Sequence, residues 1–498
     1  MADVFLSMKN VNKRYVGVQA LSSVDFEIEK GEIHCLVGEN GSGKSTLIKI
    51  ISGAVEPDDG AEIEIDGKPF QHFQAIDSIH KGIEVIYQDL SLFPNLTVAE
   101  NIALSQVIAT GNRIINYKEV QNIAKSAMAR VEVDIPLDAL VGEIAIADQQ
   151  LVAICRALTS DVQLLIMDEP TSSLTKKEID ALFGVVKDMQ SKGIATLFVS
   201  HKLNEVLQIA ERVTVLRDGK VVGTFPSSEL DDEKLTMLMT GKKVEYSLYR
   251  PQASDGQALL EVRRLAKRGN FKAIDFELKP GEILGITGLL GSGRTELALA
   301  LFGVSPADSG EILLSGRPVK IRSVQDAIRH GIGYVPEDRL VEGLVMPQAV
   351  QRNLVLTVLS QMVNQFRLID RRRIQATVNQ WVDELAIKVP SVDSPVQTLS
   401  GGNQQRVVLA KWIATNPKVL ILDGPTIGID VAAKHAIHEI IRGLVKQGIA
   451  ILLISDEVQE VYNNCNRIIV MHKGLFIKEF ETTQTSAEAI QDFINSTG

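Results

Sequence analysis

The segment GENGSGKS, residues 38 to 45, has residue types and a spacing that suit phosphate binding. It follows the apolar stretch IHCLV, which predicts a strand, and precedes KSTLIKIIS, which predicts a helix ending near Gly53. Glycines let backbone N–H groups turn inward around phosphate oxygens, and the helix N-terminus adds positive potential. We expect Lys44 to reach the outer phosphates and the Ser45 hydroxyl to ligate Mg²⁺. The alternative is a glycine-rich turn with an exposed lysine, but a chance match to this pattern is on the order of a few per cent.

Three further apolar stretches end in polar residues that could complete a phosphate-transfer site. LLIMDE ends in Asp168 and Glu169, which fit a metal-linked acid and a base for water. Gln88 follows GIEVIY and could ligate Mg²⁺ or place water, and His201 follows ATLFVS and could contact the terminal phosphate. Each of these residues alone is more often an ordinary loop or strand-end residue. Their order and spacing beside a phosphate loop favour the catalytic interpretation.

These segments recur after about 250 residues, so the chain carries two similar domains. GENGSGKST is matched by GLLGSGRTE from residue 288, and LIMDEPTSSLT from residue 165 is matched by LILDGPTIGID from residue 420. We place the domains at residues 1–245 and 258–498, with a short polar linker at 246–257.

Each half alternates strand-like and helix-like segments, which predicts an α/β fold around a largely parallel sheet. A helical insertion is expected in each half. In the first half it follows Gln88 and opens with a capping box of Thr97 and Glu100. In the second half it covers about 340 to 398.

Composition narrows the function classes. The net charge of −10 argues against general affinity for nucleic acid. The three cysteines, Cys35, Cys155 and Cys465, are widely separated, so a reducing cytosol fits better than a disulfide framework. No stretch approaches the ~20 apolar residues of a membrane span, and the N-terminus has no signal-peptide pattern. If the protein acts at a membrane, we expect other chains to cross it.

Together these motifs resemble those of the ABC-transporter ATPases. GENGSGKST, Gln88, LSGGNQQR, LLIMDEP and His201 are similar to that family's Walker A, Q-loop, signature, Walker B and switch histidine. Tyr15 resembles the aromatic residue that stacks on adenine. The tandem arrangement, Arg294, PEDR at 336–339 and LSGGNQQ resemble one subgroup, the bacterial importers of simple sugars such as ribose, xylose, arabinose and galactose.

The resemblance implies a fold and a set of contacts. The fold is two tandem P-loop NTPase domains, each with a RecA-like α/β core, a helical subdomain and an antiparallel β-subdomain. The cofactors are ATP and Mg²⁺. The implied metal ligands are Ser45, Gln88 and Asp168, and the implied catalytic residues are Glu169, His201 and Gln88. The implied nucleotide contacts of the first half are Tyr15, Gly38, Glu39, Asn40, Gly41, Ser42, Gly43, Lys44, Ser45 and Thr46. Those of the second half are Gly288, Gly291, Ser292, Gly293, Arg294, Thr295, Ser400, Gly401 and Gly402.

The second half departs from the pattern where the chemistry needs it most. Asp423 keeps the metal-linked acid, but Gly424 stands where family members commonly keep a glutamate. The signature drifts the other way, since the second half has LSGGN at 399–403 and the first half has IAIAD at 144–148. The exchanges are Lys44 to Arg294, Gln88 to Glu337, Glu169 to Gly424, His201 to Asp456 and, in a gapless alignment, Tyr15 to Leu265.

In ABC ATPases each nucleotide lies between the Walker motifs of one half and the signature of the other. For this chain that arrangement implies one complete site and one compromised site. We expect an ATP hydrolase, peripheral on the cytoplasmic face of the bacterial inner membrane, which powers a separate permease supplied by a solute-binding protein. The expected cargo is a monosaccharide, and the alternative is a nucleoside or a furanose-like signalling molecule.

Two other functions stay open at this point. A soluble tandem ABC protein acting on ribosomes would also lack membrane spans, but such proteins usually have a long charged linker and two intact sites. A nucleotide-gated regulator with little turnover is the third possibility, and the intact motifs of the first half argue against it.

Overall fold

The computed structural model divides the chain into two compact units, Met1–Val244 and Glu245–Gly498, which are described in turn. The structure describes residues 3–15, 17–70, 73–87, 89–109, 115–171, 174, 176–200, 202–241, 248–251, 256–289 and 291–497. Gln88 and His201 therefore lie outside the described residues. In the described part of the chain, no helix has both the length and the apolar character needed to cross a membrane.

A six-stranded sheet forms the centre of the first unit. Its order is β10 (Lys220–Pro226), β9 (Arg212–Arg217), β3 (Ile33–Val37), β8 (Ala195–Val199), β7 (Leu164–Asp168) and β6 (Ile83–Ile86). All neighbouring pairs are parallel except β9 with β10. Every residue of β3 and β8 is buried, because helices and a second sheet cover both faces of a parallel sheet. The apolar runs of the sequence are these inner strands.

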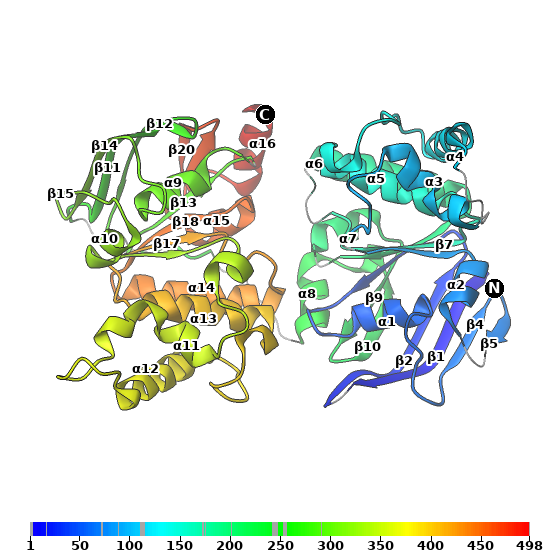
Figure 1. Ribbon diagram of the computed structural model, residues 1–498, viewed down its shortest axis with the longest axis horizontal. Coiled ribbons are helices and arrows are strands. Elements are labelled where there is room, and N and C mark those ends of the chain that lie inside the picture. Colours follow the sequence, from blue (N-terminus) through cyan, green and yellow to red (C-terminus); the bar gives the residue numbers. More distant parts are fainter. Residues whose placement is uncertain are drawn as a thin grey trace. The chain divides into compact units, whose positions relative to one another are not determined.

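The two faces of this sheet carry different layers (Figure 1). The helical insertion covers one face, and a small antiparallel sheet packs with α1 on the other. The capping box is confirmed, since the N–H of Thr97 donates to Glu100 at 2.8 Å and the N–H of Glu100 donates to Thr97 Oγ1 at 3.2 Å. The small sheet has the order β2 (Val18–Glu29), β1 (Val4–Tyr15), β4 (Glu62–Ile65) and β5 (Lys68–Phe70). The helices are α1 (Lys44–Ile51), α2 (Ala75–His80), α3 (Val98–Ala109), α4 (Tyr117–Arg130), α5 (Ile146–Ala157), α6 (Lys176–Ser191), α7 (Leu203–Ile209) and α8 (Asp232–Thr240).

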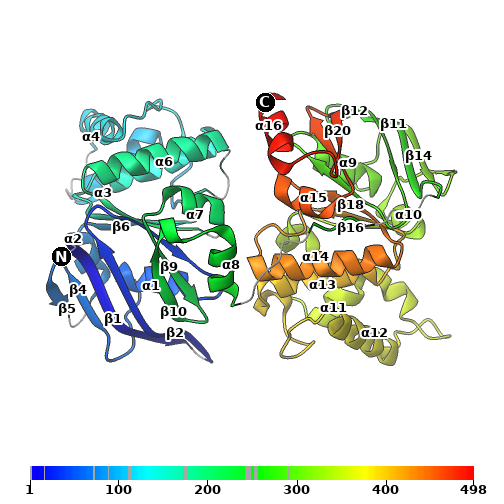
Figure 2. The same ribbon diagram turned by 180° about the vertical axis from the view of Figure 1, so that it is seen from behind.

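The second unit repeats this architecture, as the reverse view also shows (Figure 2). Its central sheet has the order β16 (Ile332–Val335), β17 (Val419–Asp423), β18 (Ala450–Ile454), β13 (Ile283–Thr287), β19 (Arg467–His472) and β20 (Leu475–Glu481). Its small sheet has the order β12 (Phe271–Leu278), β11 (Leu260–Lys267), β14 (Ser309–Leu314) and β15 (Arg317–Val319). The helices are α9 (Arg294–Leu301), α10 (Val324–Arg329), α11 (Val350–Val355), α12 (Arg371–Glu384), α13 (Gly401–Ile413), α14 (Val431–Lys446), α15 (Val458–Asn464) and α16 (Ala487–Thr497). The predicted fold class is confirmed in both halves.

One hairpin differs between the halves and corrects the gapless alignment. In the first unit Lys13 pairs with Leu21, and in the second unit Lys267 pairs with Phe271, so the second hairpin is four residues shorter. The match of Leu265 to Tyr15 is wrong, because Leu265 pairs with Ile274 inside its hairpin, well before the turn. Sequence identity could not reveal this deletion, since the two hairpins share few residues. The second half lacks the longer hairpin end that carries Tyr15.

A buried ion pair joins the strands at the edge opposite the phosphate loop. Glu32, which precedes β3, accepts hydrogen bonds from Arg212 Nε at 2.6 Å and Nη2 at 2.8 Å. His34 Nδ1 lies 2.9 Å from the same carboxylate. Burial raises the pKa of Glu32, but the hydrogen bonds from Arg212 and His34 outweigh burial and lower the pKa to about 2. The second unit has an equivalent pair, Arg467 with Glu282, at 2.8 Å.

We expect Glu32→Gln to lower the free energy of unfolding of the first half by about 2 kcal/mol at pH 7, because it leaves Arg212 without its buried partner. A carboxylate with a lowered pKa stabilises the fold above its usual pKa of 4.5, and this contribution is lost as the pH falls toward 2. Thermal unfolding between pH 3 and 7 measures the difference, which should shrink below pH 4.5. Glu261→Gln, in the exposed pair with Arg263, is the control and should change stability by less than about 0.5 kcal/mol. A difference that stayed constant with pH would contradict the prediction.

Candidate functional site

The carboxyl ends of four parallel strands bring the predicted site residues of the first half to one edge of the sheet. The phosphate loop follows β3, and Asp168 ends β7. Asp168 is paired with Val199 at the end of β8, the strand that precedes His201, and β6 precedes Gln88. Gln88 and His201 lie outside the described residues, so their roles stay predictions. The edge itself is where open α/β sheets bind ligands.

The phosphate loop is held by close backbone contacts that exclude side chains. A Cβ atom at Gly38 would lie 2.2 Å from the carbonyl oxygen of Leu216 in β9. Gly43 has φ 106°, and a Cβ atom there would lie 2.6 Å from the carbonyl oxygen of Ala20 in β2. Only glycine meets both requirements. The loop is therefore fixed by the two elements that pack on it.

Inside this loop, the polar groups fit a phosphate. Lys44 is only 7% exposed, and its ammonium donates to the carbonyl oxygens of Gly38 at 2.7 Å and Glu39 at 3.0 Å. The buried hydroxyl of Ser42 has no hydrogen-bond partner among the described residues. An unpartnered buried hydroxyl is costly unless a ligand satisfies it. The loop thus combines the Lys44 ammonium, the buried Ser42 hydroxyl and the N-terminus of α1, and this combination suits an anionic ligand.

The two carboxylates beyond β7 differ in environment. Burial raises the pKa of Asp168 above its usual value, and the charge of Glu169 adds to this, while Lys44 and Lys49 oppose it. Lys44 is thus close enough to Asp168 to act on it electrostatically. Glu169 has φ 51°, an uncommon conformation for a residue with a side chain, and its N–H donates to Val199 at 2.8 Å. Such strain is often kept where a side chain must be aimed.

A buried glutamate that the sequence analysis missed holds the loops around Glu169. Glu205 is 8% exposed and accepts hydrogen bonds from Thr171 and from Ser200, the latter at 3.4 Å. In the second half Glu460 accepts from Thr426 at 2.7 Å and pairs with His438 at 3.0 Å. The repeat of one glutamate in VSHKLNEV and ISDEVQEV was the signal that could have revealed it.

Tyr15 lies at the end of β1 and is 43% exposed. The ammonium of Lys13 lies 5.9 Å from the centre of its ring. An exposed aromatic face can stack on a nucleobase, so the side chain is open to the predicted contact.

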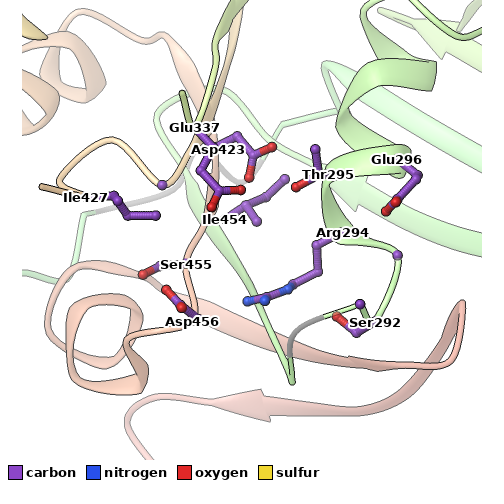
Figure 3. A pocket seen from close by; sticks show the side chains of 13 residues that line it. Ser292, Arg294, Thr295, Glu296, Glu337, Asp423, Ile427, Ile454, Ser455 and Asp456 are labelled. Carbon is purple, nitrogen blue, oxygen red and sulfur yellow. The ribbon is translucent and has the colours of Figure 1, made fainter. Parts of the chain in front are cut away.

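The second half forms a pocket at the equivalent edge of its sheet. The pocket has a volume of about 170 Å³. Figure 3 shows the guanidinium of Arg294 pointing toward Asp456, with Thr295 on the side of Asp423. The lining residues are Gly291, Ser292, Gly293, Arg294, Thr295, Glu296, Glu337, Asp423, Gly424, Ile427, Ile454, Ser455 and Asp456. The structure thus brings the divergent residues of the second half together in one place.

This pocket holds more carboxylates than cations. Burial lowers the pKa of Arg294, and the carboxylates of Asp456, Asp423, Glu337 and Glu296 oppose that effect. Arg294 is 8% exposed, and its Nη1 has no hydrogen-bond partner among the described residues. Burial raises the pKa of Asp423 to about 6, although Thr295 and Tyr334 donate hydrogen bonds to it. The pocket therefore retains a cation, Arg294, and a carboxylate of the kind that binds a metal ion, Asp423.

The side chain of Ile427 lies close to Gly424. Gly424 has φ 55°, close to the 51° of Glu169, so the backbone path is conserved between the halves. A Cβ atom at Gly424 would lie 2.4 Å from Ile427 Cδ1. The first half has Ser172 at the position of Ile427. Loss of the carboxylate is thus accompanied by a larger side chain beside it.

In the signature of the second half, the Ser400 hydroxyl is held so that it can donate a hydrogen bond. Ser400 precedes α13, and its Oγ accepts a hydrogen bond from Asn403 Nδ2 at 2.9 Å, which leaves the hydroxyl hydrogen to be donated. A Cβ atom at Gly402 would lie 2.6 Å from Cβ of Ala433 in α14, so this position requires glycine. In the first half the residue before α5 is Ala145, which has no hydroxyl.

Known proteins resemble this chain in sequence and in structure. The ABC transporter family matches residues 21–172 and 271–427. A ribose import ATP-binding protein of Rubrobacter xylanophilus is 41% identical over 485 residues, covering 97% of each chain. A putative ribose/galactose/methyl galactoside import ATP-binding protein of Agrobacterium fabrum is 41% identical over 496 residues, covering 99% of this chain and 98% of its own. The solved structure of an ATP-binding cassette of an ABC transporter, MJ1267 in its ADP conformation, covers 48% of this chain and 96% of its own, with 24% identity and a TM-score of 0.43.

The contact between Gly424 and Ile427 generates a prediction about stability. We expect Gly424→Glu to lower the free energy of unfolding of the second half by about 1–3 kcal/mol, because the new side chain overpacks the site. With Ile427→Ser added, the combined loss should be smaller than the sum of the two single losses by about 1 kcal/mol or more. Chemical denaturation of the four proteins measures this. Single effects that add within about 0.3 kcal/mol would show that Ile427 does not block the site.

Proposed function

Because this chain belongs to the ABC transporter family, we propose that it is the ATP-binding subunit of a bacterial importer. It hydrolyses ATP to drive uptake of a small solute through a separate permease. The relatives are named for import of ribose, galactose and methyl galactoside, which supports a monosaccharide as the cargo. A nucleoside or a furanose-like signalling molecule is the alternative, because the ATP-binding subunit of such an importer does not touch the transported molecule.

The observation that carries the proposal is the contrast between the two sheet edges. The first edge keeps Lys44, Ser45, Asp168 and the strained Glu169. The second edge places Gly424 where the base would stand, and Asp456 at the position of His201. We propose that the first set forms the working site, completed by Gln88, His201 and the signature residues Ser400, Gly401 and Gly402.

In this site the chain's own residues perform separate tasks. Lys44 and the loop bind the outer phosphates, and Glu169 accepts a proton from the attacking water. Ser45, Asp168 and Gln88 would hold Mg²⁺, which when bound offsets the charge that develops on the phosphates. Ser400 donates its hydroxyl to the terminal phosphate, and Tyr15 orients the adenine.

The second pocket binds nucleotide and turns it over slowly. Arg294 offers an Nη1 that has no partner among the described residues, and Thr295 donates to Asp423, which could hold a metal. Loss of a general base costs roughly 10²- to 10⁴-fold, and loss of aligned donors costs a further ~10²-fold or more. The first half contributes the weak signature, with Ala145 in place of a serine and the acidic Asp148.

The same proposal includes the partners and the location. The chain lies peripherally at the cytoplasmic face of the inner membrane, bound to integral-membrane permease subunits. A solute-binding protein delivers the cargo to the permease. Copurification of the chain with ribosomes would instead favour the soluble tandem class, and absence of turnover beside the permease would favour a regulator.

We expect Glu169→Gln in the assembled transporter to lower ATP turnover by about 10²- to 10⁴-fold, because it removes the base of the working site. The matched control is Glu64→Gln, the same exchange at an exposed position of β4, which should leave turnover within about twofold. Phosphate release and solute uptake are measured together. If Glu169→Gln kept half the activity, the assignment of one working site would be wrong.

The signature residues allow a second, independent test. Ser400→Ala should lower turnover by about 10²-fold, because it removes a donor aimed at developing charge. Ala145→Ser in the weak signature should change turnover less than twofold, because the second pocket also lacks its base. Steady-state turnover in the assembled transporter measures both, with ATP binding as a check that the variants fold. Equal losses from the two variants would contradict the division between the sites.

A further inference from the structure

One arginine of the second half bridges the pocket wall and the signature helix. Arg339 lies half-buried at the start of the turn Arg339–Gly343, which follows β16. Its Nη1 donates to the carbonyl oxygen of Ile427 at 2.8 Å, and its Nη2 donates to that of Gly428 at 3.1 Å. Its Nε donates to Gln404 Oε1 at 3.4 Å. The planar guanidinium carries its donors on three separate nitrogens, so it can reach all three acceptors at once, whereas an ammonium carries its donors on a single atom.

The two ends of this bridge belong to different functional elements. Ile427 lines the second pocket, together with Glu337, two residues before Arg339. Gln404 is buried in α13, the helix that the signature begins. A Cβ atom at Gly401 would lie 3.0 Å from Arg339 Nη2, so the guanidinium also packs against the signature itself.

The turn that carries Arg339 is itself braced. The side chain of Asp338 accepts hydrogen bonds from the N–H groups of Leu340 at 2.8 Å and Val341 at 3.0 Å. Gln404 in turn donates to the carbonyl oxygen of Leu399 at 3.1 Å, the residue before Ser400. The chain of contacts from pocket wall to signature is therefore continuous and polar.

The first half has no such bridge from this position. The equivalent residue is Leu90, which has no side-chain donor. There the direction of the contact is reversed, because Arg156 of α5 donates to the carbonyl oxygens of Leu90 at 2.9 Å and Ser91 at 2.7 Å. The bridge is found in the half whose signature is intact and whose pocket has lost its base.

We propose that Arg339 is a positioning residue that couples nucleotide occupancy of the second pocket to the placement of Ser400 and Gly401. The coupling rests on the proposed function, in which this signature completes the working site. A nucleotide that contacts the wall at Gly424 and Ile427 fixes the loop whose carbonyls Arg339 holds. Through Gln404 and Gly401, that loop in turn fixes the signature. The second pocket thus regulates hydrolysis that it does not itself perform.

A double-mutant cycle in the assembled transporter tests the coupling. Arg294→Ala removes the pocket's buried cation, and Arg339→Met removes the bridge while keeping the length of an apolar stem. Each variant alone should lower ATP turnover by about tenfold, within the range usual for coupled sites. In the Arg339→Met background, Arg294→Ala should lower turnover by less than about twofold, because the connection is already cut. Arg339→Lys should restore turnover in part.

Bound ATP is counted per chain in the Glu169→Gln background, to show that the pocket was emptied. We expect two ATP with Arg294 present and one after Arg294→Ala, while Arg339→Met keeps two. Arg329→Met, on exposed α10, is the matched control and should behave as the unaltered protein. The melting temperature of every variant is measured, and turnover is assayed below the lowest of these temperatures.

The outcomes separate the two claims. Losses in turnover that multiply across the cycle would overturn the coupling, as would two bound ATP after Arg294→Ala. An Arg339→Met variant with unchanged turnover would overturn it as well. If Glu169→Gln itself keeps half the activity, the proposed function fails first, whatever the cycle shows.

Discussion

The phosphate loop of each half is fixed by direct backbone contact with one neighbouring strand and the turn that follows it, and the rest of the site depends on this packing. In the first half the N–H of Gly219 donates to the carbonyl oxygen of Ser42 at 3.0 Å. In the second half the N–H of Gly474 donates to that of Ser292 at 2.8 Å. A side chain at Gly38 or Gly288 would meet a carbonyl oxygen at 2.2 Å or 2.1 Å. The loops are therefore held by β9 and β19 and the turns after them. Their shape does not depend on which catalytic residues lie beside them.

This division between scaffold and chemistry explains how the two halves diverged. The backbone path is the same at Glu169 and Gly424, with φ 51° and 55°, yet one carries a carboxylate and the other does not. The buried glutamates Glu205 and Glu460 hold the same threonine position in both halves. The glycines and the buried glutamates that hold the loops recur in both halves, while Glu169 and His201 are replaced by Gly424 and Asp456. The same backbone scaffold thus carries different side chains at the two sheet edges.

Local sequence patterns were enough to predict the general architecture. The apolar runs and glycine loops predicted the α/β fold, the repeat and the strand-end placement of Asp168 and Asp423, because strand burial and loop chemistry are local properties. They did not predict contacts between distant segments, such as Arg339 with Ile427 or Tyr334 with Asp423. The gapless alignment also misplaced Leu265, since a four-residue change in a hairpin leaves no trace in the strand pattern. Gln88 and His201 stay predictions from the sequence.

The segment around Gly424 therefore has a different task from its counterpart. A side chain restored at Gly424 would meet the terminal methyl group of Ile427, so Ile427 would have to move to admit it. The carbonyl of the same Ile427 is held by Arg339, and the next helix begins with Asp430 accepting from Ala433 at 2.7 Å, beside Gly402. A loop that bears a base must leave room for water, whereas a loop that aligns a signature must be rigid. Ile427 and Arg339 favour rigidity, which supports the proposal that the second half braces a signature for chemistry performed by the first.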